Sequence, residues 1–143
     1  MTGKTHIMGG IAASTAVAYY YGFDPVIMAA AGSAGALSAL ISSVFGHRTF
    51  THSLLFLLII YFLATTYIPN DSLSIGLLVG MASHLILDAG TVNGIKFLFP
   101  ASIKVRLPFY VKTGSAGEQV VLAALTVVTC YYIAVICGIS IPF

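Results

Sequence analysis

The chain has 143 residues, of which 59% are hydrophobic and only 7% are charged. A soluble domain carries about 25% charged residues, so this composition excludes an ordinary water-soluble monomer and favours a protein embedded in lipid. The net charge of +2 at pH 7 is too small and too dispersed to suggest nucleic-acid binding, and the length suits one domain over residues 1–143.

Five apolar stretches are candidates for membrane-spanning helices, each of which needs about 20 mostly apolar residues. In chain order they cover residues 5–21, 25–45, 52–68, 73–92 and 118–139. The second and fourth carry a spacing that allows close helix contact in lipid, at Ala29, Ser33 and Leu37 and at Gly76 and Gly80. The sequence therefore predicts an all-α, polytopic membrane helix bundle with about five transmembrane helices.

Every lysine and arginine falls on one side of this five-span arrangement, before span one, between spans two and three, or between spans four and five. These residues are Lys4, Arg48, Lys96, Lys104, Arg106 and Lys112. The opposite side holds Asp24, Asp71 and no basic residue. Because lysine and arginine are enriched in cytoplasmic loops, the pattern predicts a cytoplasmic N-terminus and an external C-terminus.

Residues 93–117 form the longest segment outside the predicted spans. The segment mixes aromatic and aliphatic residues with four basic residues and two prolines. Such a composition is typical of a stretch that lies in the membrane interface on anionic lipid. A plain cytoplasmic loop is the alternative.

All four histidines and two of the four carboxylates fall on the predicted cytoplasmic side. They are His6, His47, His52, His84, Asp88 and Glu118. His84 and Asp88 are four residues apart, so their side chains share one helical face. The pair can supply two ligands to one metal, or one ligand and a carboxylate that orients the imidazole. A His–Asp hydrogen bond that only ties helices together is the alternative.

A second motif surrounds the predicted start of the third span, where His47 and His52 lie five residues apart with Arg48 between them. Two such histidines can bind a metal and leave the arginine to meet an anionic substrate. Alternatively, His52 is an interfacial histidine and Arg48 a topology anchor. Ser53 is a candidate N-cap for the third span.

Glu118 has two possible roles that are compatible with each other. Residues 115–118 read Ser-Ala-Gly-Glu and match the capping box that satisfies the first backbone donors of a helix. The carboxylate can also turn toward the histidines. Imidazoles combined with carboxylates suit zinc first and then manganese or iron, and bound zinc can activate a water for attack on an ester.

Several segments together resemble the YdjM family, whose members are described as membrane-bound, metal-dependent hydrolases. They are GKTHIMGG at residues 3–10, GHRTFTHSLL at 46–55, the segment 83–100 that begins SHLILD, and residues 114–118. That family is similar to the zinc-dependent phospholipase C and single-strand nuclease superfamily. The resemblance implies a bacterial inner-membrane location and a phosphoester substrate, and membrane residence suggests a phospholipid.

The resemblance also implies residue roles. His6, His52, His84, Asp88 and Glu118 would be metal ligands. His47 would lie beside them as a further candidate ligand. Arg48 would touch the phosphate, and Asp88 or Glu118 would serve as general base.

One departure from the family pattern lies before the His-Arg motif. Family members carry an acidic Asp-x-Asp-His-type segment and a longer loop there, whereas here LISSVF at residues 40–45 runs directly into Gly46 and His47. Either this chain lacks those ligands or a loop is omitted near Ser42 and Ser43.

The predicted function is a membrane-bound, metal-dependent hydrolase that attacks a phosphoester at the cytoplasmic face through a metal-activated water. The alternative is a non-catalytic membrane scaffold, or a transporter-like module, with a vestigial metal site.

Overall fold

The computed structural model describes residues 1–44, 50, 52–98, 101 and 103–139 of the chain. The described residues include five α-helices and no strand. The helices are α1 (Gly3–Tyr21), α2 (Pro25–Val44), α4 (Leu54–Tyr67), α5 (Asp71–Ala89) and α6 (Ala116–Ile136). The all-α prediction is confirmed. Each predicted apolar stretch overlaps one of these helices, with bounds that differ by a few residues.

Capping side chains account for where several helices begin. Asn70 accepts a hydrogen bond from the Leu73 N–H at 2.9 Å, so α5 begins at Asp71 rather than at the first apolar residue. Ser53 accepts from the Phe56 N–H at 3.3 Å, which confirms it as the N-cap of α4. Because Ser53 begins the helix, His52 lies just outside it, on the chain that enters the helix.

Glycines let α2 approach both α1 and α5 until the backbones touch. A Cβ added to Gly80 would lie 2.0 Å from the Gly32 carbonyl oxygen, and one added to Gly10 would lie 2.4 Å from the same oxygen. A Cβ on Gly35 would lie 2.2 Å from the Leu77 oxygen. Approach as close as this is open only to residues without a side chain.

The predicted contact positions are right on α5 and wrong on α2. Gly76 and Gly80 both face α2, as expected. Leu37, however, is 38% exposed, and the contact runs through Gly32 and Gly35 instead. The α2 face lies beside the predicted one because glycine permits closer backbone approach than alanine or serine does.

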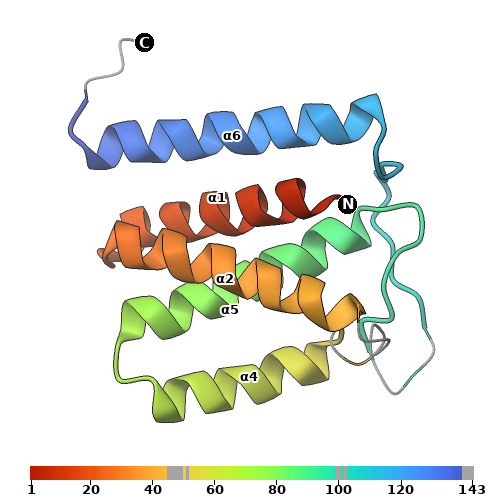
Figure 1. Ribbon diagram of the computed structural model, residues 1–143, viewed down its shortest axis with the longest axis horizontal. Coiled ribbons are helices and arrows are strands. Elements are labelled where there is room, and N and C mark those ends of the chain that lie inside the picture. Colours follow the sequence, from red (N-terminus) through yellow and green to blue (C-terminus); the bar gives the residue numbers. More distant parts are fainter. Residues whose placement is uncertain (45–49, 51, 99–100, 102, 140–143) are drawn as a thin grey trace.

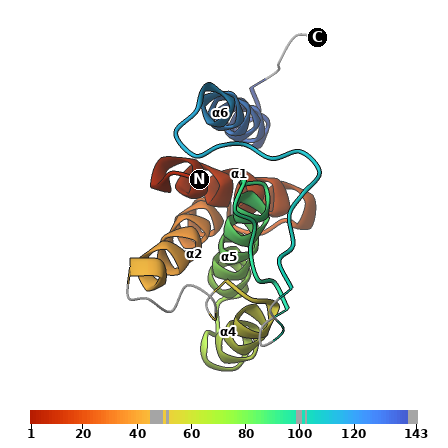
Figure 2. The same ribbon diagram turned by 90° about the vertical axis from the view of Figure 1, so that its right-hand side faces the viewer.

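The helices lie side by side in an elongated bundle (Figures 1 and 2). α1, α2 and α5 form the centre, α6 lies outside against α1, and α4 lies outside against α5. One end of the bundle collects the starts of α1, α4 and α6 together with the ends of α2 and α5 (Figure 1, right). The short connections from α1 to α2 and from α4 to α5 lie at the other end.

The segment between α5 and α6 folds back on the helix ends instead of hanging free. Isolated bridges pair Thr91 with Val111 and Ile95 with Val105. Ile95 is buried in a small hydrophobic core beside the C-terminal turns of α5. Phe109, in contrast, is 89% exposed, so the apolar residues of this segment divide between the protein interior and the surface. Its predicted position in the membrane interface stays a prediction.

By length and composition alone, two of the described helices, α5 and α6, could cross a membrane. Their mean hydropathies are 1.5 and 2.1. Pro25–Leu37 and Leu54–Tyr67 are apolar but shorter. The five-span arrangement therefore stays a prediction.

Candidate metal centre

Three histidines from three different parts of the fold surround one carboxylate. His6 Nε2 lies 3.0 Å from Asp88 Oδ1, His52 Nε2 lies 3.3 Å from Asp88 Oδ2, and His84 Nε2 lies 3.5 Å from that same oxygen. The Met1 amino group also lies 3.2 Å from Oδ1. Both carboxylate oxygens therefore face several nitrogen atoms at once.

The helix ends explain why these side chains meet. His84 and Asp88 are one turn apart near the end of α5, and His6 lies in the first turn of α1. His52 immediately precedes the N-cap of α4. All four side chains are buried, with Asp88 the most exposed at 6%. Burial of this many ionisable groups is costly unless they pair or bind a metal.

The contacts among the imidazoles are compatible with a cation between them. The rings of His6 and His84 stack with centroids 4.0 Å apart. The Nε2 atoms of His52 and His84 lie 3.1 Å from each other while both approach the same oxygen of Asp88. If both nitrogens donated a proton to that oxygen, the two N–H groups would face one another. A metal removes this conflict because each nitrogen then presents a lone pair.

The spacing of these atoms fits a metal ion with nitrogen and oxygen ligands. Zinc bonds to histidine nitrogen and carboxylate oxygen are about 2.0–2.2 Å long, which sets tetrahedral donors about 3.3–3.6 Å apart. The four contacts run from 3.0 to 3.5 Å. One donor atom from each of His6, His84 and Asp88 lies within 4.8 Å of the other two. The residues present therefore fit the predicted ligand set.

In two imidazoles of this cluster, the Nδ1 atoms have fewer hydrogen-bond partners than the Nε2 atoms. The Nδ1 atoms of His6 and His84 are buried and have no hydrogen-bond partner among the described residues. A metal-bound histidine usually donates its other N–H to a carboxylate or a carbonyl. These two imidazoles are held by their Nε2 contacts and by ring stacking, without a hydrogen bond at Nδ1 among the described residues.

Glu118 lies at the same end of the bundle but bonds to other partners. Its Oε1 accepts hydrogen bonds from the Thr2 N–H and, at 2.7 Å, from the Thr5 hydroxyl. Its Oε2 accepts from the Gly114 N–H at 2.6 Å. The side chain is 1% exposed, and it is not part of the group of donor atoms that gathers around Asp88. These bonds join the start of α1 to the start of α6.

The capping box predicted at residues 115–118 is wrong in its details. Ser115 is the N-cap of α6, but its side chain makes no capping bond. The Glu118 carboxylate reaches the N–H of Gly114, one residue before the N-cap, instead of the N–H of Ser115. The physical reason is that Thr2 and Thr5 draw the carboxylate toward α1.

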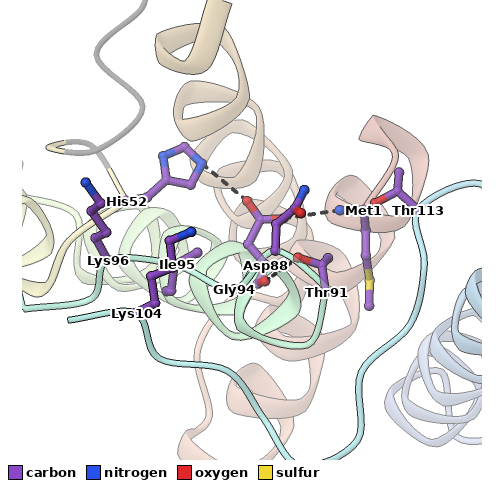
Figure 3. Close-up of a pocket in the computed structure, with 10 residues that line it drawn as sticks. Met1, His52, Asp88, Thr91, Gly94, Ile95, Lys96, Lys104 and Thr113 are labelled. Carbon is purple, nitrogen blue, oxygen red and sulfur yellow. Dashed lines mark hydrogen bonds and ion pairs between the residues drawn. The ribbon is translucent and has the colours of Figure 1, made fainter. Parts of the chain in front are cut away.

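A cavity of about 360 Å³ opens beside this centre (Figure 3). Its lining includes Asp88 and His52 together with two lysines, Lys96 and Lys104. From the sequence, both lysines were interpreted as markers of the cytoplasmic side and as part of the basic interfacial segment. No local sequence pattern places them in a site. His47 and Arg48, predicted as a further ligand and as a phosphate contact, lie outside the described residues.

The comparisons with known proteins agree on one family. The sequence matches the YdjM inner membrane protein family over residues 1–141. It is 63% identical over 150 residues to the uncharacterized protein YvsG of Bacillus subtilis (strain 168), across 92% of this chain and 94% of that protein. It is 38% identical over 100 residues to the inner membrane protein YdjM of Escherichia coli (strain K12), across 64% of this chain and 50% of that protein. No solved structure matches the chain.

The alignment with YvsG spans 150 positions but covers 92% of the 143 residues of this chain. YvsG therefore carries residues that have no counterpart here.

These matches confirm two predictions made from the sequence. The resemblance to the YdjM family is correct, and so is the location in a bacterial inner membrane, because the family and its Escherichia coli and Shigella flexneri members are named as inner membrane proteins. The chain belongs to the YdjM inner membrane protein family.

Proposed function

We propose that this protein is a membrane-bound, metal-dependent hydrolase that acts on a phosphoester at the cytoplasmic face of the inner membrane. The observation that carries the proposal is the convergence of His6, His52 and His84 on the carboxylate of Asp88. Ionisable groups buried within a membrane protein are costly, and they are functional by default. The adjoining cavity gives a substrate access to this group of residues.

The proposed ligands are the three histidines and Asp88, and zinc suits them best, with manganese or iron as alternatives. A divalent ion held there supplies Lewis acidity and activates water for attack on an ester. Asp88 has both oxygens engaged by nitrogen atoms, so it serves better as a ligand than as a general base. Its backbone oxygen accepts a 2.7 Å hydrogen bond from Thr91, which steadies the end of α5.

Glu118 is proposed as a positioning residue. Three donors occupy its carboxylate, which leaves it poorly placed to take a proton from water. Because Glu118 joins the starts of α1 and α6, it helps to hold α1 in the position from which His6 contacts Asp88.

The proposed membrane arrangement has five spans with a cytoplasmic N-terminus. Its support is the distribution of charged and aromatic residues over the two ends of the bundle. The metal-centre end carries the described basic residues, and Asp24 and Asp71 belong to the other end. Tyr20, Tyr21 and Tyr67 are each at least 70% exposed at that other end. Exposed tyrosines of this kind are typical of a membrane–water interface.

A transporter or scaffold with a vestigial site is the second candidate. A transporter usually places its substrate site near the bilayer midplane, at broken helices. Here the buried histidines and carboxylates lie at helix ends, which favours the hydrolase. Uptake of metal by proteoliposomes without hydrolysis of any ester would reverse this ranking.

The test is elemental analysis of the purified protein, paired with assays on soluble phosphoesters and phospholipids. The His84→Ala variant is expected to lose bound metal and turnover while it keeps its helical circular dichroism. Ile86→Ala is the matched control, since Ile86 lies on the same helix and is 62% exposed. Full metal content in His84→Ala would refute the proposed ligand set.

A further inference from the structure

The cavity beside the metal centre is lined mainly by polar and cationic groups. Around Asp88 and His52 it presents the side chains or backbone of Thr91, Asn93, Gly94, Ile95, Lys96, Lys104, Thr113 and Met1. Figure 3 shows Lys96 and Lys104 on the same side of Asp88 as His52. Asp88 is the only acidic residue in this lining, and it is already surrounded by nitrogen atoms.

The backbone brings the two lysines together. Ile95 and Val105 form an antiparallel bridge with reciprocal N–H to oxygen bonds of 3.0 and 2.8 Å. Lys96 directly follows one residue of this bridge and Lys104 directly precedes the other, so the bridge holds the two lysines near each other, and both line the cavity. Gly94 makes the close pairing possible, because it has a φ of 60° and a Cβ there would lie 2.7 Å from the Val105 oxygen. Two ammonium groups on the lining of one cavity raise its positive potential and favour an anion there.

The carboxylates among the described residues do not pair with these lysines. Among the described residues, no ion pair involves Lys96 or Lys104. Glu118 is committed to Thr2, Thr5 and Gly114, and the two remaining acids, Asp24 and Asp71, belong to the opposite end of the bundle. Both lysines are therefore available to bind an anion from outside the chain.

We propose that Lys96 and Lys104 form a phosphate-binding subsite, which holds the anionic group of a phosphoester beside the His–Asp cluster. The inference rests on the proposed function and deepens it by naming the residues that select the substrate. A phosphate has enough oxygen atoms to meet two ammonium groups while one oxygen stays free to face the metal centre. Lysine binds phosphate as a point charge and needs no planar geometry.

The phosphate can belong to a lipid headgroup or to a soluble ester, and both place the same chemistry on the lysines. Leu98 and Phe109, on the same segment, are 47% and 89% exposed. Exposed apolar side chains on the segment that carries the lysines suit a lipid environment. The two sources are separated by the experiment.

The experiment measures binding on the full chain in neutral phosphatidylcholine nanodiscs, with inorganic phosphate as the soluble probe. A second arm uses nanodiscs that contain phosphatidic acid and no added phosphate, with a fluorescent phosphatidic acid as the reporter. Lys96→Ala and Lys104→Ala are each expected to weaken binding about tenfold or more, because each removes a charged partner. Lys112→Ala is the matched control, since Lys112 lies on the same segment but does not line the cavity.

The outcomes decide the proposal in either direction. If inorganic phosphate binds and its binding depends on the two lysines, the subsite is supported and a soluble phosphate is enough to occupy it. If only phosphatidic acid binds in a lysine-dependent way, the subsite is supported for a lipid headgroup. Binding that survives Lys96→Ala and Lys104→Ala, or that falls equally in Lys112→Ala, overturns it. Failure of the wild-type protein to bind either probe also overturns it.

Metal content and hydrolysis, measured on the same samples, keep the two proposals distinguishable. A protein that binds phosphate through the lysines but holds no metal refutes the hydrolase and leaves the subsite standing. A protein that holds metal and hydrolyses esters equally well with or without the lysines refutes only the subsite.

Discussion

His6 Nε2 lies 3.0 Å from Asp88 Oδ1, and this contact joins the first turn of α1 to the last turn of α5. Neither helix could direct its side chain there unless α1 and α5 ran antiparallel in close contact. The glycines along α2 make that arrangement possible, since α2 packs directly against both helices. The packing of the bundle and the geometry of the site therefore have the same cause.

Replacing Asp88 by asparagine is expected to remove the metal while preserving the shape of the side chain. The amide keeps one oxygen but loses the negative charge, and its NH₂ group then faces imidazole nitrogens. Metal affinity should fall about 100-fold or more, because even outer-shell partners of a metal ligand contribute about 10- to 100-fold. Competition with a chelating dye measures the change. An affinity within a factor of two of wild type would exclude Asp88 as a ligand.

Replacing Glu118 by glutamine separates the two roles considered for this residue. A positioning role predicts that metal content stays unchanged while stability drops by about 1–3 kcal/mol. The cost arises because an amide can accept from Thr2 and Thr5 but then turns its NH₂ group toward the Gly114 N–H. Thermal unfolding in detergent and hydrogen exchange along α6 report the loss.

The control for this variant is Gln119→Ala, on the exposed neighbouring position of the same helix turn. Loss of metal from Glu118→Gln at unchanged stability would restore the role predicted from the sequence, in which Glu118 is a ligand.

Much of the fold could be predicted because a membrane environment restricts the secondary structure that an apolar segment can adopt. Long apolar runs must become helices, since every backbone polar group needs an internal partner in lipid. The five-span arrangement, in which all basic residues lie on one side, then predicted that His6, His52, His84 and Asp88 lie at one end of the bundle. His84 and Asp88 followed most directly, because residues four apart share a helical face.

The features of the fold and the site that could not be predicted from the sequence depend on contacts between segments far apart in the chain. The carboxylate of Glu118 bonds to Thr2 and Thr5, at the other end of the chain, and no local pattern encodes such a pairing. Residues 93–117 read as a loop because isolated bridges and single backbone bonds to the helix ends, rather than a helix or a strand, order their described part. The position of Lys96 and Lys104 beside Asp88 could not be predicted for that reason.

Adding a methyl group at Gly80 should weaken the bundle. The Cβ of Gly80→Ala would lie 2.0 Å from the Gly32 carbonyl oxygen, so α2 and α5 would have to separate. Overpacking of this kind typically costs about 1–3 kcal/mol. Ala34→Leu is the control, because Ala34 is exposed on the helix that carries the opposing carbonyl. Equal melting temperatures for Gly80→Ala and wild type would mean that the two helices do not pack this closely.

Acidification should release the metal, and it should do so steeply. An imidazole binds a metal only in its neutral form, so protons compete with the metal at each of His6, His52 and His84. The sign follows directly: metal affinity rises with pH and falls on acidification, so it should decrease between about pH 7.5 and about pH 5.5. Three histidine ligands predict a steeper pH dependence of affinity than one ligand does. Chelator competition across this range measures the slope, with His52→Ala as the comparison. If the variant and wild type show the same slope, His52 is not a ligand and the centre contains only His6, His84 and Asp88.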